Sequence, residues 1–305
     1  MSLPLSKEVL DLQREYPRAG RFRIHSLLEQ QRDEPPPSEP TVGRAMILNR
    51  RFHGAPGPWK SARDELPEPI SYNHLPYRLD DPHHMWFTDI RYLVQLDGTW
   101  VYSLCVLEGD SRKMLAGMVS EHQDLTAMLQ LLFVALSEYG CPKAIVSDNG
   151  SVFTAGAYLG ILRALEIEPL HIEKGKPWQN LIEAQFKVQL RLGDFKFEQA
   201  QTLAEVQNEH AAFIETLNTT RHWAHRKRAD GYRTPVDVLG GLRGRRIEPT
   251  RLRQLFGGAA FLRTVNRYGF VSVQRFYIYA DSGLSRQRVL IWIYEGELGM
   301  STKRR

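Results

Sequence analysis

The fold is decided by the stretch MWFTDIRYLVQL (residues 85–96), DG (97–98) and TWVYSLCVL (99–107). Both longer runs are rich in aromatic and β-branched residues, which favour strands. Asp-Gly between two such runs is a strong hairpin signal, because both residues tolerate positive φ angles. The stretch therefore predicts two antiparallel strands joined by a tight turn.

After this hairpin, the hydrophobic pattern predicts strands interleaved with helices. We expect a third strand at 113–119 and further strands at 143–147 and 168–172. The expected helices span residues 124–139, 155–165, 179–192 and 202–217. This order predicts an α/β fold, in which a mixed sheet is covered by helices.

Residues 1–52 predict a small helical domain. A proline-rich break, RDEPPPSEP (32–40), separates two helices from a third, TVGRAMILNRRF (41–52), which Thr41 is expected to cap. The third helix carries arginines. This order, in which a break separates helices from a basic helix, is compatible with a helix-turn-helix that binds DNA. A helical subdomain with a solvated basic face fits the periodicity equally well.

Three further segments complete the expected organisation around a core at 80–220. Residues 53–79 contain five prolines among polar residues and predict an extended linker. Residues 221–255 hold ten Arg or Lys against three acids, with glycine and proline that suggest loops, and are interpreted as a basic connector. Short aromatic and β-branched runs over 256–305 predict a small β-barrel.

Composition sets broad limits. At 305 residues the chain has room for one large domain or two to three small ones, and 42% hydrophobic residues argue against global disorder. A net charge of +5 points only weakly to a polyanionic partner. Cys105 and Cys141 lack metal-site spacing and are expected to be reduced core residues of a cytosolic protein. No apolar run is long enough to predict a membrane span.

Three acidic residues stand in contexts that suggest a shared pocket. Asp89 lies inside the aromatic strand, where a charge is costly unless it is paired or bound to a metal. Asp148 follows a strand at its carboxyl end, where α/β sheets place ligand sites. Glu183 lies at the edge of the packed face of a helix. Each also has a plainer explanation: a solvent-facing strand residue, a turn aspartate, or half of a surface Glu–Lys pair.

Cations and an aromatic residue accompany these carboxylates along the chain. Glu183, Lys187 and Arg191 recur every four residues and would form one stripe on a helix. Contacts with DNA are expected from Lys174, Lys176, Trp178, Lys187, Arg191, Arg221, His225, Arg226, Lys227 and Arg228, with His222 in the same group. Trp178 could equally cap the helix core, and the group at 221–228 could be a solvated basic loop.

Three sequence blocks carry a family resemblance. Trp86-x-x-Asp89, Asp148-Asn-Gly-Ser-x-Phe153, and Gly175-Lys-Pro177 followed by Ile182-Glu183 resemble the signature blocks of DDE transposases. These enzymes belong with retroviral integrases to the RNase H-like superfamily. The resemblance covers about residues 80 to 240, including an RTPxxVL ending typical of bacterial insertion-sequence enzymes. Residues 12–51 resemble a transposase helix-turn-helix, and residues 256–298 resemble the small β-barrel after many integrase cores.

The resemblance implies a mechanism and partners. Asp89, Asp148 and Glu183 would hold two Mg²⁺ or Mn²⁺ ions that support cleavage of transposon ends and strand transfer into target DNA. The implied partners are terminal repeats, target DNA and further copies of the chain, in the cytoplasm and on the nucleoid, with no membrane. Many relatives have Thr where this chain has Arg91, and Lys where it has Leu190.

Two other functions stay open from the sequence. The chain could be a catalytically idle or truncated DNA-binding remnant of a transposase, because relatives often begin with an additional helix-turn-helix. It could also be another RNase H-fold nuclease that acts on RNA–DNA hybrids or junctions. Intact acidic contexts argue against the first function, and basic flanking segments argue against the second.

Overall fold

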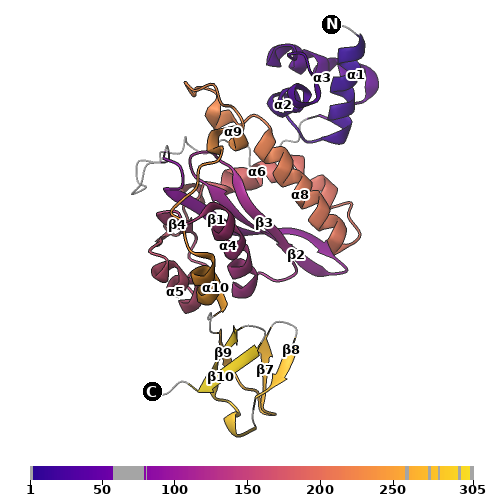
Figure 1. Cartoon of the computed structure of the whole chain (residues 1–305). Coiled ribbons are helices and arrows are strands. Elements are labelled where there is room, and N and C mark those ends of the chain that lie inside the picture. Colours follow the sequence, from indigo (N-terminus) through magenta and orange to yellow (C-terminus); the bar gives the residue numbers. More distant parts are fainter. Residues whose placement is uncertain are drawn as a thin grey trace.

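Three groups of elements follow one another along the chain: a helical unit, an α/β core and a set of short strands (Figure 1). The computed structural model describes residues 3–57, 79, 81–257, 261–273, 276–280, 282–294 and 297–302. The core contains a five-stranded sheet of order β3-β2-β1-β4-β5. Its strands are β1 (Met85–Leu96), β2 (Thr99–Glu108), β3 (Met114–Ser120), β4 (Ala144–Ser147) and β5 (Glu168–His171).

The sheet confirms the predicted hairpin and the predicted fold class. Asp97 and Gly98 have φ angles of 49° and 80°, as a two-residue turn between twisted strands requires. Strands β1, β2 and β3 are antiparallel neighbours, whereas β4 pairs in parallel with β1, and β5 with β4. The core sheet is therefore a three-stranded antiparallel meander, extended by two parallel strands beside β1.

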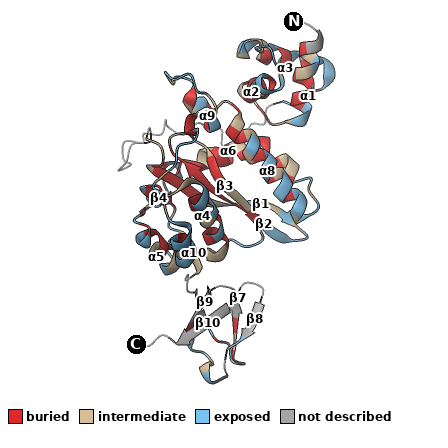
Figure 2. Cartoon of the chain, viewed as in Figure 1, coloured by how far each residue is buried: buried red, intermediate tan, exposed pale blue. Residues whose placement is uncertain are grey.

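Helices cover both faces of this sheet. Successive residues of β1 point to opposite faces, so their neighbours show what covers each face. Trp86 packs with helices on one face, and Phe87 packs with helices on the other. Figure 2 shows buried residues in the sheet and exposed residues on the outer helix surfaces. The core helices are α4 (Leu125–Tyr139), α5 (Gly156–Ala164), α6 (Ile182–Leu192), α7 (Asp194–Phe197) and α8 (Leu203–Thr219).

The expected helix over 179–192 is interrupted near its start. The chain forms a 3₁₀ turn, η1 (Pro177–Gln179), and α6 begins only at Ile182. Asn180 causes the break, because its side chain donates to the carbonyl oxygen of Thr88 on β1 at 3.1 Å. This contact fastens the start of α6 to the sheet.

The N-terminal unit consists of α1 (Leu3–Glu15), α2 (Arg21–Gln31) and α3 (Glu39–His53). The expected cap at Thr41 is wrong, because α3 starts two residues earlier, after Ser38. Pro40 lies in the first helical turn, where its fixed φ and missing N–H are tolerated. The helix-turn-helix identity of this unit stays a prediction.

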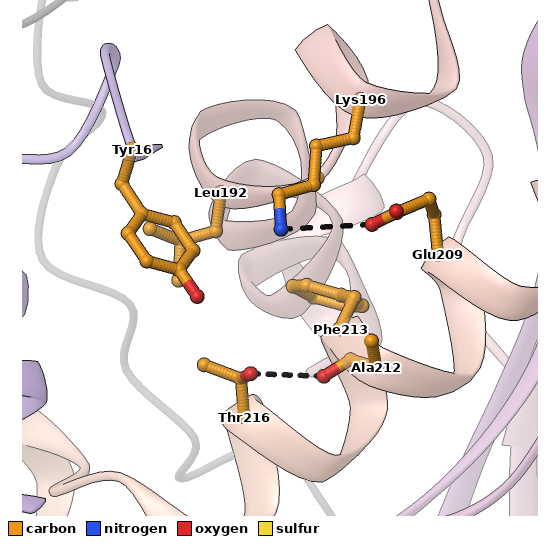
Figure 3. A pocket seen from close by; sticks show the side chains of 8 residues that line it. Tyr16, Leu192, Lys196, Glu209, Ala212, Phe213 and Thr216 are labelled. Carbon is orange, nitrogen blue, oxygen red and sulfur yellow. Dashed lines mark hydrogen bonds and ion pairs between the residues drawn. The ribbon is translucent and has the colours of Figure 1, made fainter. Parts of the chain in front are cut away.

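The helical unit packs against the core. Arg23 is buried and donates to the Thr220 hydroxyl at 3.2 Å and to the Arg221 carbonyl at 3.3 Å. Tyr16 lies over the Lys196 ammonium at 5.1 Å from the ring centroid, beside a cavity of about 40 Å³ (Figure 3). Burial raises the pKa of Tyr16 to about 12. These contacts join α2 and the end of α1 to α7 and α8.

The remaining segments differ in part from expectation. The basic connector contains helices α9 (Pro235–Leu239) and α10 (Pro249–Gly257) where loops were expected, because Thr234 caps α9 and a proline starts each helix. Residues 58–78 of the expected linker lie outside the described residues, and residue 53 still belongs to α3. The described part of the chain has no helix with the length and apolarity needed to cross a membrane.

The C-terminal strands form two small sheets. One sheet has three strands and the other has two, around the buried side chains of Val265, Val271 and Val289. The strands are β6 (Phe261–Thr264), β7 (Phe270–Val273), β8 (Phe276–Tyr279), β9 (Arg288–Tyr294) and β10 (Glu297–Thr302). A closed barrel stays a prediction. Cys105 and Cys141 are buried and free, as expected.

Candidate active site

Asp89 and Asp148 lie near each other in the middle of the sheet, where strand β4 ends beside β1. In the parallel pair of β1 and β4, Phe87 is opposite Val146. Asp89 and Asp148 each come two residues later, so they occupy equivalent positions on neighbouring chain segments. Asp89 is still within β1, so its side chain projects to the same side as Phe87. Asp148 follows β4 directly, and its charge acts on Asp89.

Asp89 is held inside strand β1, where it lies opposite Cys105 of β2. Its Oδ1 accepts the backbone N–H of Ile90 at 2.7 Å. The pKa of Asp89 is raised to about 7, chiefly by burial and also by the charges of Glu183 and Asp148, against the lowering effect of the Ile90 hydrogen bond. The carboxyl group therefore sits in a partly dry, acidic environment.

Asp148 follows β4 directly, in a loop that is pinned to β5. Its Oδ1 accepts the N–H of Gly150 at 2.9 Å, and its carbonyl oxygen lies 3.0 Å from Nδ1 of His171. Asn149 donates its side-chain amide to the Ile172 carbonyl at 2.8 Å. These contacts fix the direction in which the carboxylate leaves the strand.

Glu183 reaches the same place from the first turn of α6. Burial raises its pKa, the charge of Asp148 also raises it, and the cations Lys187 and Arg91 lower it. Each of the three carboxylates thus acts electrostatically on the other two. The structure brings the three residues singled out in the sequence into one acidic site.

The donor set of this site fits a hard divalent cation. It offers carboxylate oxygens, which are the ligands that Mg²⁺ and Mn²⁺ prefer, on three groups whose charges act on one another. Within the described ranges no group of three His, Cys, Asp or Glu side chains is close enough to enclose an ion.

The cations predicted beside Glu183 lie at the surface. Lys174, Lys187 and Arg191 are exposed, and Lys176 pairs with Glu173. The Trp178 side chain is 43% exposed, so it does not cap the helix core. The stripe of Glu183, Lys187 and Arg191 therefore runs outward from the acidic site along α6.

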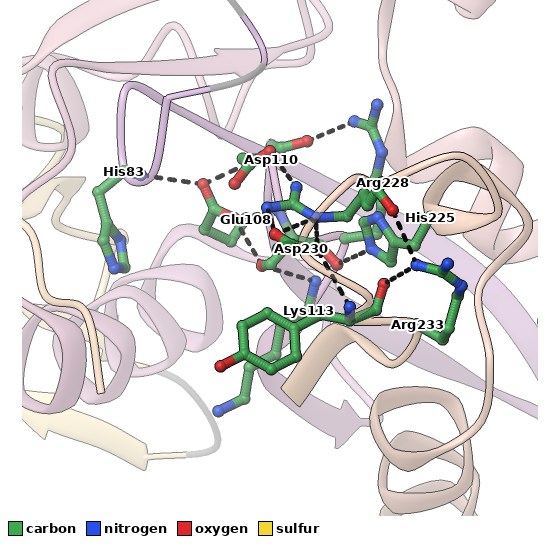
Figure 4. Close-up of polar contacts among 12 residues, drawn as sticks. His83, Glu108, Asp110, Lys113, His225, Arg228, Asp230 and Arg233 are labelled. Atoms are coloured by element: carbon green, nitrogen blue, oxygen red, sulfur yellow. Dashed lines mark hydrogen bonds and ion pairs between the residues drawn. The ribbon is translucent and has the colours of Figure 1, made fainter. Parts of the chain in front are cut away.

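The segment 221–228 is only partly a free basic surface. Arg221 pairs with Glu29 at 3.3 Å, and Arg226 pairs with Glu39 at 3.1 Å, both acids of the helical unit. Arg228 lies between Asp110 and Asp230 (Figure 4). Lys227 is exposed.

Two histidines predicted in this segment do not fit a DNA contact. His225 is 2% exposed and its Nε2 lies 2.8 Å from the Ser111 carbonyl. His222 is 1% exposed and its Nε2 lies 3.0 Å from the Gln185 amide nitrogen. Burial lowers the pKa of both rings, so both are neutral structural residues near pH 7. The prediction was wrong because sequence alone could not show that this loop folds inward.

Sequence reasoning missed a set of polar residues around the site. Arg91 contacts Asp194 through both guanidinium amino groups and donates to Oε1 of Gln189 at 2.8 Å. Asn180 makes the contact to β1 described above. The available signal was that Gln185 and Gln189 fall four residues apart on α6, at positions that turn out to be buried.

Comparison with known proteins gives an independent result. Residues 80–177 match the family model "Integrase core domain". The match includes Asp89 and Asp148 and ends before Glu183. A transposase for insertion sequence element IS904 from Lactococcus lactis is 29% identical over 161 residues, which cover 51% of this chain and 62% of the relative. An uncharacterised 39.2 kDa protein of insertion element IS476 from Xanthomonas euvesicatoria is 25% identical over 187 residues, which cover 61% of this chain and 51% of the relative.

Solved structures also resemble the chain. The magnesium complex of the HTLV-2 integrase catalytic core domain, in its dimeric form, has a TM-score of 0.40 at 15% identity and covers 52% of this chain and 97% of that one. The simian T-cell lymphotropic virus intasome in complex with PP2A regulatory subunit B56 gamma has a TM-score of 0.48 at 13% identity. The match covers 97% of this chain and 100% of that one.

The chain spans roughly half to three-fifths of the length of its insertion-element relatives. Residues 80–177 therefore match the integrase core domain, and the chain is similar to these insertion-element proteins over half to three-fifths of its own length.

Proposed function

We propose that this chain catalyses metal-dependent cleavage of DNA and joining of the resulting 3′ end to a target strand. The observation that carries the proposal is the acidic site itself: β1, the end of β4 and the start of α6 each supply one carboxylate, and all three interact. The integrase core domain and the insertion-element relatives support the same reaction class.

In this proposal, two Mg²⁺ or Mn²⁺ ions, when bound, supply activation of the attacking oxygen and stabilisation of the leaving oxygen. Asp89, Asp148 and Glu183 would hold the ions. The hydrogen bonds from Ile90 and Gly150 orient the two aspartates before any ion arrives. Since the attacking group is water or a DNA 3′-hydroxyl, no protein nucleophile is needed.

The surface around the site supplies the proposed DNA contacts. Lys187 and Arg191 lie along α6 and would contact phosphates, with Lys174 and Lys176 from the preceding loop. The exposed ring of Trp178 would stack on a base at the DNA end. Arg221, Arg226, Lys227 and Arg228 would grip the DNA backbone farther away, in competition with their acidic partners. The proposed substrates are the element's terminal repeats and target DNA, bound by more than one copy of the chain in the bacterial cytoplasm.

The test is a strand-transfer assay with labelled DNA ends from the element that encodes the chain. We expect cleaved and joined products with Mg²⁺ or Mn²⁺ and none with EDTA. Asp148→Asn should lose about three orders of magnitude in rate, because metal-held charge stabilisation contributes several kcal/mol. DNA binding by the same variant should persist in a gel-shift measurement.

Three outcomes would overturn the proposal. Undiminished strand transfer by Asp148→Asn would remove the acidic site from the chemistry. A wild-type chain that binds the ends without cutting them would be a DNA-binding remnant. Cleavage of an RNA–DNA hybrid in preference to duplex ends would indicate a nuclease of the same fold.

A further inference from the structure

The segment that carries Glu183, from Asn180 into helix α6, is fastened to strand β1 at two points. On one side, Asn180 donates to the carbonyl oxygen of Thr88 at 3.1 Å. On the other side, Gln189 accepts from the Arg91 guanidinium at 2.8 Å. Thr88 and Arg91 flank Asp89 on β1, just as Asn180 and Gln189 flank Glu183. The two contacts therefore bracket the Asp89–Glu183 pair.

The contact at Gln189 is built into a buried polar network. Arg91 lies directly opposite Ser103 in the β1–β2 pairing. The Gln189 amide donates to Ser103 Oγ at 3.4 Å, so this one side chain contacts both members of the cross-strand pair. Ser103 Oγ in turn lies 2.7 Å from Nε2 of His210 on α8. The network thus links β1, β2, α6 and α8 behind the site.

Asp194 locks the guanidinium in this network. It pairs with two nitrogens of Arg91, and its side chain is 7% exposed against 19% for Arg91. A two-pronged pair of this kind fixes orientation as well as distance, which a lysine ammonium does not. Because Asp194 belongs to α7, the pair also holds the turn after α6 against the sheet.

We propose that Arg91 is a positioning residue of the candidate active site: clamped by Asp194, it holds Gln189 and thereby sets the distance between Glu183 on α6 and Asp89 on β1. Arg91 does not touch the reacting atoms in this assignment. It acts on the metal ligands through the placement of α6. The inference rests on the proposed metal-dependent function.

The test measures Mn²⁺ binding directly, by electron paramagnetic resonance of the free ion, with the full chain and no DNA. Arg91→Lys keeps the charge but loses the two-pronged geometry, and Gln189→Leu removes the link without changing any charge. We expect each substitution to raise the Kd for Mn²⁺ by about tenfold, in the range for groups that orient metal ligands. Strand transfer should fall in kcat with little change in KM for DNA.

The matched control is Arg18→Lys. Arg18 also contacts one carboxylate, that of Glu198, through two nitrogens, at 3.3 and 2.8 Å, but it joins the helical unit to the core away from the acidic site. Its Kd for Mn²⁺ should equal that of the wild type.

Two results would overturn the inference while leaving the proposed function standing. In the first, Arg91→Lys and Gln189→Leu melt at lower temperature but bind Mn²⁺ with the wild-type Kd. In the second, neither variant folds by circular dichroism, which would make the network general structural support. A wild-type chain that binds no Mn²⁺ would be a different failure, since it would overturn the metal-dependent function and this inference with it.

Discussion

Asp89 and Asp148 occupy equivalent positions on neighbouring parallel segments, each two residues beyond the opposed pair of Phe87 and Val146. The two carboxylates come from chain segments 59 positions apart, yet the sheet register alone makes them neighbours. Burial raises the pKa of Asp89, and the charges of Glu183 and Asp148 contribute to the rise. The site therefore costs the metal-free chain stability.

Asp89→Asn should stabilise the metal-free chain at high pH. The pKa of Asp89 is about 7 when folded and near 3.9 when unfolded, so the folded chain binds the extra proton between these values. The contribution of protonated Asp89 to the free energy of unfolding is fully present below about pH 4, and it is lost as the pH rises through 7. At pH 8 we expect the variant to be more stable by about 2 kcal/mol, since a tenfold change in acidity corresponds to 1.4 kcal/mol and water still reaches the site.

Urea unfolding in EDTA at pH 5 and pH 8 measures this difference. The exposed Asp33 provides the control, because Asp33→Asn should follow the wild type at both values. The prediction would be contradicted if the free energy of unfolding changed equally between pH 5 and pH 8 in Asp89→Asn and in the wild type.

Asn180→Leu should weaken metal binding beyond its effect on stability. The substitution removes the donor to the Thr88 carbonyl and should cost about 1–3 kcal/mol, because a buried acceptor loses its partner. It also releases the start of α6, which carries Glu183. We expect a rise of about tenfold in the Kd for Mn²⁺.

Asn218→Leu is the matched control. Asn218 also clamps backbone, since it accepts from the Met114 N–H at 2.8 Å and donates to the Met114 carbonyl at 2.9 Å, on another edge of the sheet. It should lose similar stability and keep the wild-type Kd. Equal effects of both variants on Mn²⁺ binding would count against the role given to Asn180.

Lys187→Ala should weaken DNA binding in a salt-dependent way. Lys187 is exposed on α6, one turn beyond Glu183, where it can contact a phosphate. We expect the slope of log K against log salt concentration to fall by about one, which corresponds to one lost phosphate contact. Fluorescence anisotropy at several salt concentrations gives this slope. Lys143→Ala, at the opposite end of β4, should leave it unchanged.

Gly244→Ala should destabilise the core by about 1–3 kcal/mol through overpacking. A Cβ at Gly244 would lie 2.2 Å from the carbonyl oxygen of Cys141, which backbone bonds to Arg245 hold in place. Thermal melting should show the loss. Gly241→Ala has no atom within 4 Å of its added Cβ and should melt with the wild type. Equal melting temperatures for the two variants would refute this account.

Much of the core could be predicted because its strands and helices follow the pattern of neighbouring residues in the sequence. The core strands and most core helices come within a few residues of expectation, because alternation and turn residues act over short distances. The errors arose where one side chain outweighs the local pattern. Asn180 interrupts a helical run by bonding to Thr88, which lies 92 residues away in sequence. Pro40 moves the start of α3, since its ring fits the first helical turn.

The amino-acid sequence by itself determined the sheet, its hairpin and the three acidic positions, because each depends on neighbours along the chain. Only the tertiary structure decided which polar residues serve the site. His222 and His225 look like surface cations in the sequence, but burial removes them from the surface and lowers their pKa values. Arg91 has no role that the sequence reveals, but Asp194 and Gln189 hold it within the protein beside the acidic site. The burial of a side chain and its pairing with a distant segment both depend on how the elements pack. The sequence pattern does not reveal this packing.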